Sequence, residues 1–193
     1  GLECRVDQER SEAVRGGKAT AVRCFPISID FESQSTEAAS PAVTGEMDRW
    51  RRELGLSGGE VVGIGLDRLD YTKGIPEKLK AVDRFLEQNP SYVGRMVFVQ
   101  VVVPSRSRIP TYNALSEEVT RLAEEVNWRW STDSWRPVAL LRNYEGSVRM
   151  MALHRLADFC LVTPLHDGMN LVAKEFVASR FDADGVLILS NFA

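Results

Sequence analysis

The chain has 193 residues, a length that suits one large domain or a domain with part of another. With 44% hydrophobic and 26% charged residues it has the composition of a globular protein, and a formal net charge of −3 excludes a strongly basic surface for nucleic acids or anionic membranes. The two histidines are too few for a histidine-rich metal site. The three scattered cysteines do not form a disulfide framework, and this use of cysteine predicts a cytoplasmic protein.

The chain before residue 60 carries weak patterns. Residues 19–29 form a β-like run, and we expect residues 1–30 to be the residual end of a preceding domain with its crossover. Residues 31–59 are expected to hold a linker and a helix. Within them, the Ser, Thr, Ala and Glu content of residues 32–45 indicates a linker or a short exposed helix. A helix is predicted over residues 46–54, with one apolar side.

From residue 60, strands and helices alternate. The predicted strands are residues 61–66, 96–103, 138–141, 159–162 and 186–189. The predicted helices are residues 77–88, 111–127, 147–156 and 169–179. This alternation predicts an α/β fold with a Rossmann-like, doubly wound, mainly parallel sheet. Because the chain stops directly after a strand, we expect residues 60–193 to form one domain that is truncated at its carboxyl end.

Two helices have apolar positions at helical spacing, which predicts their buried faces. In helix 77–88 the residues expected to point inward are Leu79, Val82, Phe85 and Leu86. In helix 169–179 the shared face holds Met169, Val172, Ala173, Phe176 and Val177. Glu175 lies off that face, where a carboxylate is usually solvated.

Charged side chains follow several of the predicted strands. Arg68 and Lys73 come after the first strand, Arg106 after the second, and Asp167 after the fourth, just before a helix. Because the carboxyl ends of parallel strands share one edge of a sheet, these four side chains could converge there. Cations beside a helix N-terminus predict a phosphate or nucleotide site. No reaction type follows from this pattern alone.

A structural alternative stays open for each of these residues. Arg68 could pair with the neighbouring Asp67 or Asp70, and Lys73 could be a solvated loop lysine. Asp167 could be the N-cap of the helix that follows, a role worth about 1 kcal/mol. The chain contains neither a complete dinucleotide-binding fingerprint nor a P-loop, which argues against those two classes of nucleotide site.

Three motifs resemble the trehalose-6-phosphate synthase family. They are GLDRLDYTKGIP at residues 65–76, VPSR at residues 103–106 and TPLHDGMNLVAKE at residues 163–175. Their order and spacing match the family, and FPISID at residues 25–30 resembles the segment by which that family enters its second domain. The resemblance covers most of the chain.

The resemblance implies a retaining glycosyltransferase built from two Rossmann-like domains in the GT-B arrangement. Its members transfer glucose from UDP-glucose, or another NDP-glucose, to glucose 6-phosphate and form trehalose 6-phosphate. This chain would supply the C-terminal, donor-binding half and would be inactive without the N-terminal domain. A glucosylglycerol-phosphate synthase-like transferase and a non-catalytic nucleotide-sugar-binding fragment remain as alternatives.

The resemblance also implies residue roles. Arg68 and Lys73 would contact the donor diphosphate and Asp167 the hydroxyls of the transferred glucose, which makes these three the expected catalytic residues. Glu175 would bind the ribose hydroxyls, and Arg106 would contact the acceptor phosphate. The rest of the implied donor site comprises Gly168, Met169, Asn170, Leu171 and Val172. The resemblance implies no metal, cofactor, nucleic-acid or membrane partner, and it allows a homo-oligomer of the full-length enzyme.

Overall fold

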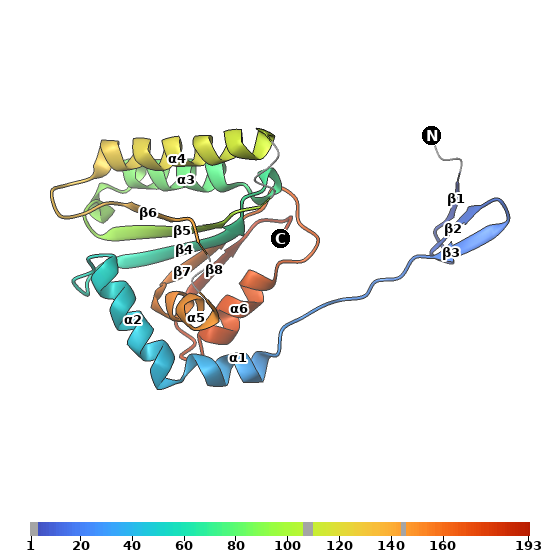
Figure 1. The fold of residues 1–193 in the computed structure, drawn as a ribbon, viewed down its shortest axis with the longest axis horizontal. Helices are drawn as coiled ribbons and strands as arrows, with labels where there is room; N and C mark the ends of the chain where they lie inside the picture. Colours follow the sequence, from blue (N-terminus) through green and yellow to red (C-terminus); the bar gives the residue numbers. More distant parts are fainter. Residues whose placement is uncertain (1–3, 106–109, 144–145) are drawn as a thin grey trace.

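The structure of the chain, a computed structural model, describes residues 4–105, 110–143 and 146–193. A five-stranded parallel sheet in the order β6-β5-β4-β7-β8 organises most of it (Figure 1). Its strands are β4 (Val61–Arg68), β5 (Met96–Val103), β6 (Val138–Leu141), β7 (Phe159–Val162) and β8 (Val186–Leu189). The predicted doubly wound α/β fold is confirmed.

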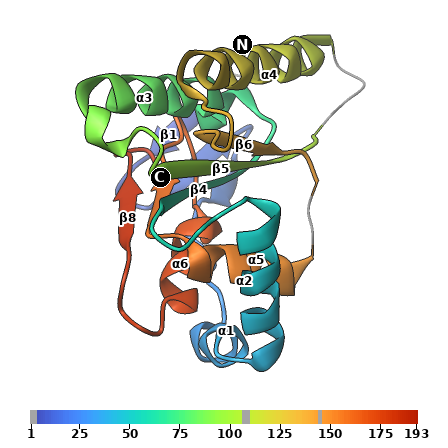
Figure 2. The same ribbon diagram turned by 90° about the vertical axis from the view of Figure 1, so that its left-hand side faces the viewer.

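Helices cover both faces of this sheet (Figures 1 and 2). One face carries α3 (Ile75–Gln88) and α4 (Pro110–Trp130), and the other carries α5 (Ser147–Leu156) and α6 (Leu171–Ser179). Two further helices, α1 (Phe31–Ala38) and α2 (Pro41–Glu53), pack against α6 and α5. Short 3-10 turns occur at η1 (Tyr71–Lys73) and η2 (Pro90–Tyr92). No helix in the described ranges is long and apolar enough to cross a membrane.

The strand β5, which lies between β6 and β4, contributes to both hydrophobic cores. Phe98 and Val102 pack in the core beneath α3 and α4, whereas Val97, Val99 and Val101 pack in the core beneath α5 and α6. A parallel strand that is buried on both faces needs an almost continuous apolar sequence, which is the signal that predicted β5 with its correct bounds.

Residues 32–45 belong to two helices, α1 and α2, which are joined by a turn at residues 39–40, and do not form a linker. Asp30 caps α1 by accepting a hydrogen bond from the Ser33 N–H at 3.0 Å, and Ser40 caps α2 just before a proline. Most residues of α1 are exposed, as expected, but Ala38 and Val43 are fully buried. The two N-cap residues, Asp30 and Ser40, therefore mark consecutive helices in this stretch.

Two predicted helix faces need correction. Phe85 is 36% exposed and packs edge-on against Tyr92 of η2, with ring centroids 5.0 Å apart, instead of pointing into the core. Met169 precedes α6, which begins two residues later than expected because Asn170 is its N-cap. Val177 is 48% exposed, so only part of the predicted apolar face of α6 is buried.

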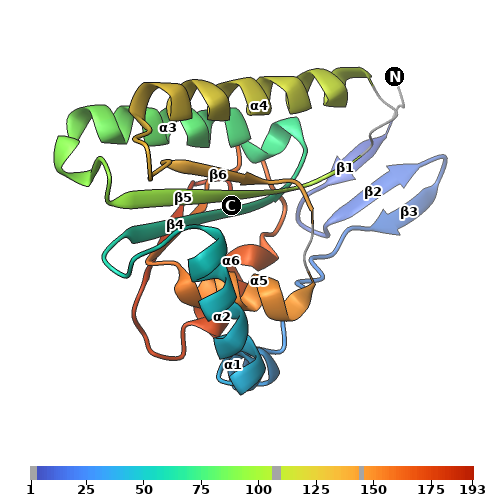
Figure 3. The same cartoon turned by 60° about the vertical axis from the view of Figure 1, so that its left-hand side comes forward.

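The N-terminal residues form a separate antiparallel sheet away from the five-stranded one (Figures 1 and 3). Its strands are β1 (Arg5–Asp7), β2 (Glu12–Arg15) and β3 (Lys18–Ala21). The expected β-like run thus ends at Ala21, and residues 22–30 continue without regular secondary structure. Most of this sheet is exposed, because none of the described helices covers it.

Candidate active site

The candidate site lies where the order of the strands reverses. The strand β4 has β5 on one side and β7 on the other, so the chain winds outward in both directions from β4. The pairing of β4 with β5 continues to Arg68, but its pairing with β7 ends at Ile64. Ligands of open α/β sheets bind outside the carboxyl ends of the strands at such a switch point.

The loops that follow β4 and β7 meet at this edge. The backbone N–H groups of Leu165 and His166 both donate to the Thr72 carbonyl, at 2.7 and 3.2 Å. Gly74 ends η1 with a φ of 62°, and a Cβ atom placed on it would lie 2.9 Å from the Thr163 carbonyl oxygen. The left-handed conformation and the close approach both require glycine at this position.

Replacing Gly74 with alanine is therefore expected to destabilise the chain by about 1–3 kcal/mol. The new methyl group must push the two loops apart in addition to straining the backbone. Urea unfolding measures the loss. The matched control is Gly94→Ala, because Gly94 also has a positive φ, of 80°, but has open space around it. Equal stability of the two variants would contradict the role assigned to the close contact.

An ion pair joins the two loops through side chains. Lys73 Nζ lies 2.6 Å from Asp167 Oδ2, and the two side chains are only 12% and 14% exposed. Asp167 also accepts hydrogen bonds from the Gly168 N–H at 3.0 Å and from Asn170 Nδ2 at 3.1 Å. Burial opposes ionisation of Asp167, but the hydrogen bonds, with that from Lys73 the strongest, hold its pKa below the usual range.

Both structural alternatives for this pair are therefore wrong. Lys73 is not a solvated lysine, since its ammonium group is held by Asp167. Asp167 is not the N-cap of α6, since Asn170 caps the helix by accepting from the Ala173 N–H at 3.1 Å. The structure brings a fixed cation and a fixed carboxylate together at the switch point.

The first turn of α6 presents backbone donors beside this pair. Among the described residues no acceptor is found for the N–H groups of Leu171 and Val172. Unpaired N–H groups in the first turn of a helix carry a partial positive charge and bind anions. Both residues belong to the donor site that the family resemblance implies.

Arg68 is the last residue of β4, and its side chain is exposed at the same edge. Neither neighbouring aspartate holds it: Asp67 pairs with Lys78 at 2.6 Å, and Asp70 accepts hydrogen bonds from Thr72. Within the described ranges the guanidinium group makes no ion pair or hydrogen bond. Arg68 is therefore a cation available to a ligand.

Glu175 lies one turn along α6 and is partly buried, not solvated as expected. Burial raises the pKa of this carboxyl group, and the side chain makes no hydrogen bond with any described residue. The neighbouring Lys174 donates to the Ile27 carbonyl at 3.0 Å, which holds the N-terminal segment against α6. Together with Met169, this segment lines a recess of about 550 Å³ beside the candidate site.

Two further expectations concern the acceptor phosphate and a metal ion. Arg106, expected to contact an acceptor phosphate, lies outside the described residues. In the ranges that are described, no group of three or more His, Cys, Asp or Glu side chains is placed to hold a metal ion.

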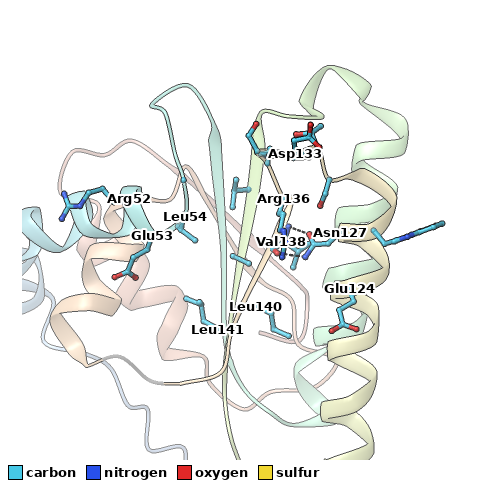
Figure 4. A pocket seen from close by; sticks show the side chains of 18 residues that line it. Arg52, Glu53, Leu54, Glu124, Asn127, Asp133, Arg136, Val138, Leu140 and Leu141 are labelled. Atoms are coloured by element: carbon cyan, nitrogen blue, oxygen red, sulfur yellow. Dashed lines mark hydrogen bonds between the residues drawn. The ribbon is translucent and has the colours of Figure 1, made fainter.

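A larger groove of about 950 Å³ lies along the edge strand β6, between the end of α2 and α4 (Figure 4). None of the predicted site residues that the structure describes lines this groove. At its centre, the Asn127 side chain accepts from the Val138 N–H at 3.0 Å and donates to the Val138 carbonyl at 2.9 Å. This amide satisfies the backbone N–H and carbonyl of Val138 in the edge strand, which is a structural role.

Comparison with known proteins finds a family match along almost the whole chain. The model of glycosyltransferase family 20 matches residues 2–193. The bifunctional trehalose-6-phosphate synthase/phosphatase of Thermoproteus tenax is 44% identical over 178 residues, which make up 92% of this chain and 24% of that protein.

Solved structures share the fold. The UDP-forming alpha,alpha-trehalose-phosphate synthase of Burkholderia vietnamiensis superposes with a TM-score of 0.87 at 35% identity, over 95% of this chain and 41% of that one. The E. coli trehalose-6-phosphate structure bound with UDP-2-fluoro glucose gives 0.86 at 31% identity, over 100% and 42%. The chain spans between 24% and 42% of the length of these proteins. By sequence and by fold, it belongs to glycosyltransferase family 20.

Proposed function

We propose that this chain supplies the donor-binding half of a retaining trehalose-6-phosphate synthase, which transfers glucose from UDP-glucose to glucose 6-phosphate. The observation that carries the proposal is the Lys73–Asp167 pair at the switch point, beside the unpaired N–H groups of α6. Cations and helix donors suit a diphosphate, and a charged carboxylate suits sugar hydroxyls. The relatives that form UDP or bind a UDP-sugar support the same donor.

The charges match the demands of glycosyl transfer. As the bond between glucose and UDP breaks, negative charge grows on the departing diphosphate while the sugar becomes oxocarbenium-like. Arg68, Lys73 and the first turn of α6 would stabilise that negative charge where it develops. We propose that the acceptor hydroxyl attacks from the face that UDP leaves and gives its proton to the departing phosphate. Because two cations neutralise the diphosphate, this route needs no metal.

Lys73 can serve the donor without leaving Asp167. An ammonium group has three N–H donors, and Asp167 occupies one of them at 2.6 Å. The other donors remain for phosphate oxygens, while Asp167 keeps acceptor capacity for glucose hydroxyls. The partly buried carboxyl group of Glu175, which has no partner among the described residues, would accept hydrogen bonds from the ribose.

This assignment leaves the acceptor side to other parts of the protein. We propose that residues 60–193 form the donor domain, that residues 1–30 end a preceding domain, and that residues 31–59 connect the two. Most acceptor contacts would then come from that preceding domain, with Arg106 reaching the acceptor phosphate. The 193-residue chain alone is expected to bind UDP without transferring glucose. We further propose a cytoplasmic location, and the proposed function allows a homo-oligomer of the full-length enzyme.

Titration calorimetry of the chain with UDP and UDP-glucose, beside a thermal melt, tests the donor site. We expect saturable binding of both ligands and a cooperative melt whose midpoint rises with UDP concentration, because UDP binds only the folded state. Uridine is the control, and it should bind far more weakly because it lacks the diphosphate. A chain that melts cooperatively but ignores UDP would refute the donor-site assignment.

A further inference from the structure

A buried ion pair sits at the base of the loop that carries Lys73. Lys78 Nζ lies 2.6 Å from Asp67 Oδ2, and the two side chains are 0% and 3% exposed. Gln100 of β5 donates to the same carboxylate oxygen at 3.0 Å and to the Gly65 carbonyl at 3.2 Å. Neither Lys78 nor Gln100 has a role in the proposed transfer reaction.

Stability alone does not account for this pair. Taking two charges out of water is costly, and replacing a buried ion pair with apolar side chains of similar volume is often neutral or stabilising. The surroundings are apolar, since Ile75, Leu79 and Val102 belong to the same core. The Gln100 Oε1 atom is buried without a hydrogen-bond partner in the described structure, which adds a further cost.

The position of the pair suggests what it does. Asp67 immediately precedes Arg68, and Lys78 lies in the first turns of α3, directly after the loop of residues 69–74. The pair therefore joins the two ends of the loop that presents Lys73. Successive side chains of a strand point to opposite faces, so fixing the side chain of Asp67 also fixes the direction in which Arg68 leaves the strand.

We propose that the Asp67–Lys78 pair is a positioning device for Arg68 and Lys73, retained for diphosphate binding and not for folding. The proposal rests on the proposed function, because it presumes that these two cations meet a nucleoside diphosphate. Lys78 and Asp67 act through the loop and touch no ligand. Gln100 supports them by holding the Asp67 carboxylate in one orientation.

The test removes both charges together, since removing one would leave the other buried and unpaired. In the double variant Asp67→Val/Lys78→Met, Gln100 keeps its hydrogen bonds to the carbonyls of Gly65 and Val101. We expect a thermal midpoint equal to or above that of the unaltered chain, together with a Kd for UDP weakened about tenfold or more because both cations are misplaced.

A double-mutant cycle separates positioning from a general effect on the fold. If the pair acts through Arg68, then Arg68→Ala should weaken UDP binding much less in the charge-free background than in the unaltered chain. The matched control is Arg129→Gln, which removes two exposed ion pairs between α4 and α3, with Asp83 at 3.0 Å and Glu87 at 2.7 Å, and should leave the Kd for UDP unchanged.

Each outcome decides the matter. Failure of the unaltered chain to bind UDP would refute the proposed function and leave the pair without this role. If the unaltered chain binds UDP, a stable charge-free variant with the same Kd overturns the positioning proposal. A charge-free variant that no longer melts cooperatively also overturns it, because the pair would then serve folding. Additive losses in the cycle would exclude an action through Arg68.

Discussion

Arg68→Ala is expected to lower the kcat of the complete enzyme about 10²-fold or more, on the scale of losing one donor that stabilises transition-state charge. The free energy of unfolding should stay within about 0.5 kcal/mol of the wild-type value. Both expectations follow from the same observation. The Arg68 side chain is exposed at the carboxyl edge of β4 and makes no ion pair or hydrogen bond within the described ranges, so its charge is available to the leaving diphosphate but contributes little to folding.

Steady-state kinetics and urea unfolding, measured on the same variants, check this pair of expectations. The matched control is Arg84→Ala on α3. The Arg84 side chain is 70% exposed, and its ion pair with Glu87 is long, at 3.9 Å. Arg84 lies away from the carboxyl edge, so its loss should change neither kcat nor stability. If Arg68→Ala turned over at the wild-type rate, Arg68 would have no part in stabilising the leaving group.

Much of the fold was predictable because its signals are local and periodic. The apolar run of β5 gave that strand its bounds, and the alternation of strands with helices gave a parallel sheet. A parallel sheet places the loops after β4 and β7 at one edge, so the proximity of Lys73 and Asp167 followed from topology before any contact was visible.

The particular partners were not predictable, because they depend on contacts distant in sequence. Asp167 and Asn170 are both good N-cap residues, and only the contact of Asp167 with Lys73, 94 positions away, decides which of them caps α6. Lys78 is a related case. A lysine beside Leu79 on an amphipathic helix is normally placed at the solvent boundary, yet here Asp67 draws it into the core.

His154 presents a second effect of large expected size, on stability. The side chain is 2% exposed on α5, and neither ring nitrogen has a hydrogen-bond partner in the described structure. Its ring stands almost perpendicular to that of Phe176 on α6, with centroids 6.2 Å apart. Burial without a partner lowers the pKa of His154 to about 4.

The direction of the pH effect follows from linkage. Unfolded His154 takes up a proton below a pKa of 6.5, whereas folded His154 resists protonation until about 4, so the unfolded state binds more protons in this window. The contribution is fully present above pH 6.5 and is lost as the pH falls toward 4. It amounts to about 2 kcal/mol between pH 7 and pH 5.

Two carboxyl groups also make stability depend on pH, either between pH 7 and pH 5 or at lower pH. Burial raises the pKa of Glu175, so as the pH falls the folded state protonates Glu175 at a higher pH than the unfolded state does. This protonation stabilises the folded state as the pH falls and so opposes the effect of His154. Hydrogen bonds, chiefly from the Ser57 side chain, lower the pKa of Glu60 to about 2, so its contribution is lost only below its unfolded value of 4.5. A comparison of variants between pH 7 and pH 5 therefore isolates the histidine.

Urea unfolding of His154→Leu at pH 7, 6 and 5 should show a slope flatter than that of the unaltered chain by about 2 kcal/mol over the range. At pH 7 the variant should be at least as stable, because leucine removes two buried polar atoms that have no partners. His166→Gln is the matched control. It replaces the chain's other histidine, which is exposed, and leaves the buried His154 in place. If His154→Leu left the pH dependence of the free energy of unfolding unchanged, His154 would not be the source of the loss of stability between pH 7 and pH 5.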